Sequence, residues 1–350
     1  MNSRPLRRNF PRTRMPSRLP VDPFVLALLM TVGLAALLPA SGRAAGAVGG
    51  ATTGAVALLF FLYGARLSTR EVLDGLRHWR LHVTVLACTF VLFPLLGLAA
   101  RGLVPYLLTP QLYTGVLFLC LVASTMQSSV AFTSMARGNV PAAICAGSFS
   151  SLAGIVITPL LAALLMSGGG GRISAGSVAG IVAQLLLPFL AGQLLRRRVS
   201  GFVVRHRKLL GSVDRGSILL VVYTAFSEGM TAGVWHRVTP ADLASLLLVE
   251  AALLAAMLTL SWYGAKRLGF GRADGIAIQF AGSKKSLASG LPIASVLFGP
   301  QASLAVLPLM LFHQLQIMVC ALLARRRASS PPAGNADEDR ALPQVLGGAG

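Results

Sequence analysis

Long apolar segments recur along almost the whole chain, separated by short joints that are rich in basic residues or glycine. A helix needs about 20 apolar residues to cross roughly 30 Å of hydrocarbon, and these segments have that length. They are continuously apolar, whereas the strands of a membrane barrel alternate between apolar and polar residues. The sequence therefore predicts ten helical spans, at residues 22–39, 47–65, 81–100, 112–136, 139–166, 174–195, 212–234, 241–265, 273–298 and 302–324.

The distribution of charge supports a membrane protein. Only 12% of the 350 residues are charged, about half the share in a soluble domain. The net charge of +20 is spread over short joints on one side of the predicted spans, so we expect anionic lipid head groups, and not nucleic acid, as partners. This asymmetry predicts a multi-pass protein of the plasma (cytoplasmic) membrane with both termini in the cytoplasm. The opposite side holds only Arg43, Arg101, Arg172 and Arg237.

The ten predicted spans divide into two repeats of five, at residues 21–168 and 169–327. An odd number of helices per repeat inverts the second copy relative to the membrane, as in many secondary transporters. The flanking segments, 1–20 and 328–350, are predicted to be disordered cytoplasmic tails. The four cysteines lie inside spans without metal-ligand or disulfide spacing, so we expect buried thiols, no metal and no cofactor.

The fourth and ninth spans are the most heavily interrupted by polar residues, at 124–129 and 282–286. A shift of 158 residues places Ser124 on Gly282 and Gln127 on Lys285. Two equivalent helices that unwind near mid-membrane would produce this match. The alternative is a pair of continuous helices whose hydroxyl groups bond to their own preceding turn.

Two adjacent lysines, Lys284 and Lys285, lie in the ninth span, where ionisable groups are costly and mark functional sites by default. Two like charges about 4 Å apart repel by several kcal/mol at an effective dielectric near 20. We therefore expect one lysine to be neutral or to have a carboxylate partner.

Few residues in the predicted spans could act as partners of these lysines. The acidic candidates are Glu228 and Glu250, and each could equally serve an ordinary structural role. The tenth span adds a polar cluster, His313 and Gln314 with Gln316, which suits either ligand contact or hydrogen bonding between helices.

Four stretches of the sequence are long and specific enough to identify a family: Gln127–Thr133 with Ala136–Val140, Val213–Ser217, Gly282–Pro292 and Leu307–Gln314. They resemble the SBF-like branch of the bile acid:sodium symporter superfamily, over about residues 20–327. The resemblance implies an all-helical fold of ten transmembrane helices. Spans 1, 2, 6 and 7 would form a panel domain and the other six a core domain, with broken helices 4 and 9 crossing in the core. Transport would proceed by alternating access between the two domains.

Sodium-coupled members of that superfamily bind the ion with a Ser-Asn pair in the fourth helix, hydroxyl groups in the fifth and an acid in the ninth. The resemblance places the pair at Ser128 and Ser129, one hydroxyl at Ser151 and the acid near Ser283. The acid is missing here, and an ammonium group repels sodium, so the coupling cation is predicted to be a proton or sodium, with the proton favoured. The candidate substrate and ion site comprises Ser124, Thr125, Gln127, Ser128, Ser129, Ser151, Ser283, Lys284, Lys285, Ser286 and Ser289.

The leading functional prediction is a secondary active transporter that moves a small solute, either an organic anion or an ion. An intramembrane enzyme would need clustered Asp, Glu, His or Cys, and the five histidines are scattered with no HExxH motif, so no enzyme is expected. No P-loop pattern is present for an ATP-driven pump. A regulatory membrane protein that keeps a transporter fold without turnover is the alternative.

Overall fold

The computed structural model describes residues 23–66, 78–166, 175–231, 233, 238–298 and 302–329. All regular elements in these residues are helices. The tails predicted to be disordered lie outside the described residues, apart from Ala328 and Ser329, which are the last two residues of a helix. In chain order the helices are α1 (Pro23–Leu37), α2 (Gly42–Arg66), α4 (Trp79–Ala87), η2 (Cys88–Leu92), α5 (Phe93–Ala99), η3 (Ala100–Leu103), α6 (Pro110–Leu121), α7 (Met126–Met135), α8 (Val140–Met166), α9 (Ala175–Arg205), α10 (Arg207–Thr231), α11 (Pro240–Arg267), α12 (Arg272–Gly282), α13 (Leu287–Phe298) and α14 (Ala302–Ser329).

Six helical segments in the described part of the chain are long and apolar enough to cross a membrane. They are α2, the continuous run from α4 to η3, α8, α10, α11 and α14, and the bent pair of α6 and α7 would make a seventh. The remaining predicted spans correspond to the shorter α1, to α9 with its basic second half, and to α12 and α13, which the two lysines separate. The molecule is therefore a helical, multi-pass membrane protein, while the count of ten spans stays a prediction.

Several helices extend beyond the ends of the predicted spans, most of all in the basic joint at residues 196–215. Helix α9 continues through this joint to Arg205, and α10 begins at Arg207. Arginine and lysine have good helix propensity, and their long side chains carry the charge away from the helix axis. A switch from apolar to basic residues therefore marks the end of the hydrocarbon layer and not the end of a helix.

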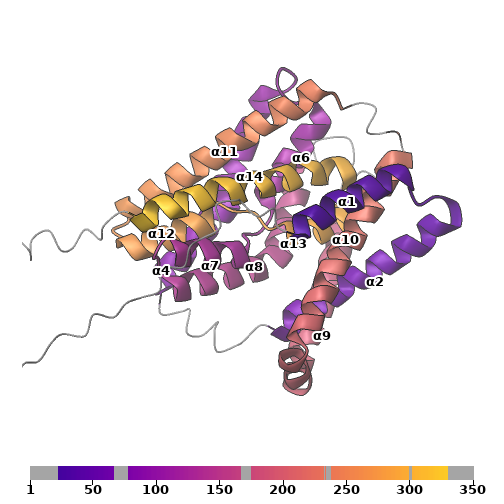
Figure 1. The fold of residues 1–350 in the computed structure, drawn as a ribbon, viewed down its shortest axis with the longest axis horizontal. Coiled ribbons are helices and arrows are strands. Elements are labelled where there is room, and N and C mark those ends of the chain that lie inside the picture. Colours follow the sequence, from indigo (N-terminus) through magenta and orange to yellow (C-terminus); the bar gives the residue numbers. More distant parts are fainter. Residues whose placement is uncertain are drawn as a thin grey trace, which may run out of the picture.

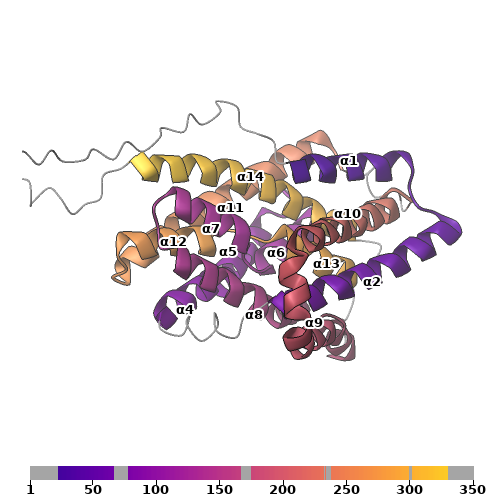
Figure 2. The same cartoon turned by 60° about the horizontal axis from the view of Figure 1, so that its bottom comes forward.

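The helices gather at two ends of an elongated molecule (Figure 1). Helices α1, α2, α9 and α10 pack against one another at one end, and α4, α7, α8 and α12 do so at the other. Helices α6, α13 and α14 lie between these groups, and α11 packs along α12 and α14. A second view shows the same separation, with α2 and α9 far from α4 and α12 (Figure 2). The middle of the molecule is thus built from the two interrupted segments and the last helix.

Helices α2 and α9 approach each other closely through two glycines. A Cβ atom at Gly64 would lie 2.0 Å from the carbonyl oxygen of Phe189, and one at Gly192 would lie 2.1 Å from the carbonyl oxygen of Phe61. No side chain fits at either position, so the backbones are in direct contact. Small residues allow this approach between membrane helices, where the hydrophobic effect adds little to association.

We expect Gly192→Ala to lower the melting temperature of the purified protein. The added methyl group forces α9 away from α2, at a cost of about 1–3 kcal/mol. The matched control is Gly180→Ala on the same helix, where a Cβ atom meets nothing within 4 Å and alanine has the better helix propensity. The control should melt at or slightly above the wild-type temperature, and equal melting of the two variants would contradict this packing.

Candidate functional site

Two helices of the molecule are interrupted by breaks of equal length. Helix α6 ends at Leu121 and α7 begins at Met126, with a bend of 66° between them, while α12 ends at Gly282 and α13 begins at Leu287. The second half-helices therefore begin 161 residues apart, at Met126 and Leu287. This offset is three residues longer than the shift of 158 read from the sequence, because that shift matched polar residue types instead of helix ends. At the offset of 161, Ser124 falls on Lys285.

The two breaks, residues 122–125 and 283–286, are hydrogen-bonded to each other and form what we call the junction. The backbone N–H of Ser286 donates to the carbonyl oxygen of Ala123 at 2.8 Å. The hydroxyl group of Ser124 donates to the carbonyl oxygen of Ala281, and that of Ser129 to Phe280 at 3.1 Å. The fourth and ninth predicted spans are thus interrupted helices that meet at their breaks, and not continuous helices.

Lys285 is completely buried, and its ammonium group is saturated with hydrogen bonds. Its Nζ atom donates to the carbonyl oxygens of Thr89 (3.0 Å), Cys120 (2.8 Å) and Val122 (2.7 Å). An ammonium group has three donors, so none is left over. The Phe93 ring also lies beneath it, with Nζ 4.2 Å from the ring centroid.

The three carbonyl groups are free because the backbone around them is irregular. Cys120 and Val122 stand at the C-terminal end of α6, where carbonyls lack partners within the helix and carry partial negative charge. Thr89 lies in the π-helical turn η2, in which the Phe93 N–H bonds to the carbonyl five residues earlier, that of Cys88. The next donor in this register would be Pro94, which has no N–H, so the Thr89 carbonyl is left for Lys285.

Lys284 is equally buried but has a different environment. Its Nζ atom has no hydrogen-bond partner and lies 4.1 Å from the ring centroid of Phe132 and 5.6 Å from that of Phe280. The two lysine side chains therefore leave the junction toward different elements, α7 and α12 for Lys284 and α5 and α6 for Lys285.

Neither lysine has a carboxylate partner among the described residues, where the one ion pair joins Arg66 to Asp214. Glu250 is completely buried on α11, and both of its carboxylate oxygens lack hydrogen-bond partners. Glu228 lies on α10 and lines a cavity away from the junction. Neither glutamate thus forms an ion pair with a lysine among the described residues.

The remaining predicted residues divide between the junction and its surroundings. Ser283 donates from Oγ to the carbonyl oxygen of Gln279 at 2.6 Å, and the hydroxyl oxygen of Ser286 accepts from the Ser289 N–H at 3.2 Å. Thr125 precedes α7 and its carbonyl oxygen accepts from Ser129. The hydroxyls of Ser128 and Ser289 are buried without partners, whereas Gln127 is exposed.

Sequence reasoning missed Ser150 and selected its neighbour. Ser150 is completely buried on α8, and its hydroxyl oxygen accepts from the Ser124 N–H at 2.9 Å. Ser151 is only partly buried, because one residue along a helix turns the side chain by about 100°. The signal that could have found Ser150 is the helical face that it shares with the buried Gly147 and Gly154.

Helix α14 contributes one polar residue of its predicted cluster to the junction. The side-chain amide of Gln316 bonds to the backbone of Lys285 in both directions, with Oε1 accepting from N–H and Nε2 donating to the carbonyl oxygen, each at 2.9 Å. His313 Nδ1 lies 3.0 Å from Gln316 Nε2, so His313 contacts the side-chain amide that bonds to Lys285. Gln314 is partly buried and takes no part in this pairing.

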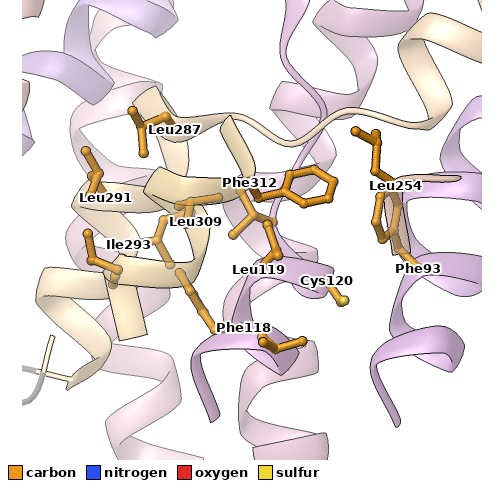
Figure 3. Close-up of a cluster of buried hydrophobic side chains, with 14 of the residues drawn as sticks. Phe93, Phe118, Leu119, Cys120, Leu254, Leu287, Leu291, Ile293, Leu309 and Phe312 are labelled. Carbon is orange, nitrogen blue, oxygen red and sulfur yellow. The ribbon is translucent and has the colours of Figure 1, made fainter. Parts of the chain in front are cut away.

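Buried apolar side chains from α5, α6, α13 and α14 pack together next to the junction (Figure 3). Leu287 and Leu291 of α13 pack with Leu309 of α14, and the rings of Phe93 and Phe312 meet edge to face at 6.1 Å. In such surroundings backbone groups and ammonium donors must find partners within the protein. No group of three or more metal-ligating side chains is present in the described part of the chain.

Comparison with known proteins places this chain in a family. The model of the SBF-like CPA transporter family matches residues 22–329. The uncharacterized protein PA2026 of Pseudomonas aeruginosa is 53% identical over 309 residues, 88% of this chain and 93% of that protein. YfeH of Escherichia coli K12 is 48% identical (87% and 92%), and sodium/bile acid cotransporter 7-A of Xenopus laevis is 30% identical (87% and 91%). The chain belongs to the SBF-like CPA transporter family.

Proposed function

We propose that this protein is a secondary active transporter that moves a small solute across the membrane by alternating access. The observation that carries the proposal is the junction, in which two broken helices meet and enclose two buried ammonium groups. Broken helices that meet near mid-membrane are the usual solute and ion sites of secondary transporters. The family membership and the cotransporter name of the Xenopus relative support the same class of function.

The proposed architecture is ten transmembrane helices in two inverted repeats. The first repeat would comprise α1, α2, the run α4–η3, the pair α6–α7 and α8, and the second α9, α10, α11, the pair α12–α13 and α14. The equal breaks support it, and so do the helices that follow them, which begin at Val140 and Ala302, 162 residues apart. In this proposal α1, α2, α9 and α10 form the panel, the other helices form the core, and both termini face the cytoplasm of a plasma membrane.

The contacts of Lys285 suggest why an acid is dispensable in this protein. Backbone carbonyls are also ligands of alkali cations, and here an ammonium group occupies the centre of three of them. Lys285 would thus supply the positive charge that holds the half-helix end of α6, with no sodium ion at this point. A tethered charge cannot cross the membrane, so the coupling ion must act elsewhere.

Lys284 is the proposed coupling residue, with the proton as the coupling ion. Its Nζ atom makes no hydrogen bond that a neutral amine would lose, and the Phe132 and Phe280 rings lie beside it. Protonation would therefore change the charge of the junction without breaking its hydrogen bonds. A buried lysine with a movable proton is a familiar device in proton-linked chemistry.

We expect the two lysines to differ in their effect on stability. Lys285→Met leaves three carbonyls without donors and should destabilise the purified protein by about 2–5 kcal/mol, seen as a lower melting temperature. Lys284→Met removes no hydrogen bond and fills the same apolar space, so its melting temperature should stay near the wild-type value. The reverse order of melting would contradict the roles assigned to the two side chains.

We also expect a proton gradient to drive transport and Lys284→Met to abolish it. Proteoliposomes that contain a pH-sensitive dye would be given a panel of small organic cations and anions under an imposed proton or sodium gradient. The matched control is Lys208→Met, which replaces an exposed lysine on α10. With wild type or this control, the lumen should become more acidic when a transported solute is present. Sodium-driven uptake that survives Lys284→Met would refute proton coupling through this residue.

A further inference from the structure

A cavity of about 350 Å³ lies where the helices α2, α9 and α10 face α13. Such a volume suits a small organic molecule and is far larger than a bare metal ion needs. Its polar lining is hydroxyl and amide groups with one carboxylate: Thr52, Thr53, Gln184, Thr224, Ser295 and Glu228. This cavity lies between the proposed panel and core, away from the junction.

The charge on the described residues that line the cavity is negative. Glu228 is the only ionisable residue among the described residues that line the cavity, and its carboxylate forms no ion pair with a described residue. Hydroxyl and amide groups bind neutral and charged solutes alike, so the carboxylate decides between anions and cations. An anionic solute would meet a like charge here without any compensating cation.

A second feature adds negative potential to the same cavity. Ser295 and Val296 belong to the last turn of α13, which ends at Phe298. The C-terminal end of a helix carries partial negative charge on its unpaired carbonyl groups, an effect that is strongest within the last turn. The side-chain and the backbone contributions therefore agree in favouring a positive solute.

Helix α13 connects the cavity to the junction. It begins at Leu287, two residues after Lys285, and Ser295 lies about 14 Å from Ser286 at 1.5 Å of rise per residue. A Cβ atom at Gly290 would lie 2.4 Å from Leu309 Cδ2, so α13 is held tightly against α14. A rigid half-helix of this kind would transmit a shift at the cavity to the hydrogen bonds of the junction.

We propose that this cavity is the solute site and that it takes a small organic cation, such as a primary or quaternary amine, with Glu228 as its counter-charge. This inference rests on the proposed transport function and narrows its solute from organic anion or ion to cation. The Thr52 and Thr224 hydroxyls, 2.6 Å apart, join α2 to α10 beside the carboxylate and would supply further oxygen contacts.

Thiol labelling tests the sign of the electrostatic potential in the cavity and requires no transport. A Thr53→Cys variant, at an exposed lining position, is treated with a cationic trimethylammonium or an anionic sulfonate methanethiosulfonate reagent, and each rate is divided by that for a free thiol in solution. None of the four cysteines is in a disulfide, and Cys145 is the one that is partly exposed, so Cys145→Ala serves as the background. We expect a preference of about tenfold or more for the cation.

The carboxylate is tested by the matched pair Glu228→Gln and Glu250→Gln in the Thr53→Cys background. The first should reduce the preference for the cationic reagent to near unity, and the second, whose residue is buried outside the cavity, should keep it. Equal labelling by both reagents in the parent, or a preference that survives Glu228→Gln, overturns the proposal. These results concern the cavity alone, so they stand whether or not the protein transports.

Uptake then identifies the solute class in the same proteoliposomes. Labelled choline and putrescine should enter at least about tenfold faster than taurocholate, and Glu228→Gln should remove that uptake. Faster entry of taurocholate overturns the assignment of a cation. Absence of any uptake together with the cationic labelling preference would instead count against the proposed transport function, and so the two failures are distinguishable.

Discussion

The hydrogen bonds of one ammonium group determine how the middle of this molecule is built. Helices cannot be interrupted inside a membrane unless the freed backbone groups find partners within the protein. Lys285 supplies three donors at one point, and they hold the end of α6 and the π-helical turn beside Pro94. The Gln316 amide then satisfies the backbone of Lys285 itself. Two breaks can therefore meet inside the protein.

The positions of the helices could be predicted from hydropathy, because crossing a hydrocarbon layer fixes the length of an apolar segment. Each predicted span overlaps a helix or a helix pair of the structure. Hydropathy says less about helix ends, as the helical joint around Arg205 and Arg207 shows. Basic residues lie outside the hydrocarbon layer, but they are good helix formers, so the helix continues through them. Hydropathy also gives no bend angle, so the geometry of the interrupted pairs required the structure.

The site was only partly predictable, for a reason that the partners of Lys285 make plain. Polar residues in apolar spans marked both breaks to within a few residues, yet the groups that bind the ammonium are backbone carbonyls of Thr89, Cys120 and Val122. Side-chain identity carries no information about these carbonyls. The one available signal was Pro94, whose missing N–H frees an acceptor in the preceding turn. Ser150 was missed because the sequence offers two adjacent serines, Ser150 and Ser151, whose side chains point about 100° apart on the helix. Residue type alone does not distinguish between them.

Two adjacent residues of the same type can have quite different surroundings when they lie in the break of an interrupted helix. In a regular helix neighbouring side chains point about 100° apart, and both remain on one rigid element. In the break, Lys285 donates to carbonyl oxygens of α6 and η2, while Lys284 lies beside the rings of Phe132 and Phe280 and makes no hydrogen bond from Nζ. One charge is thus fixed by geometry and the other is left without a hydrogen bond. Helix α13 starts two residues after Lys285, and its last turn lines the cavity that Glu228 also lines, so one half-helix joins the two lysines to that cavity.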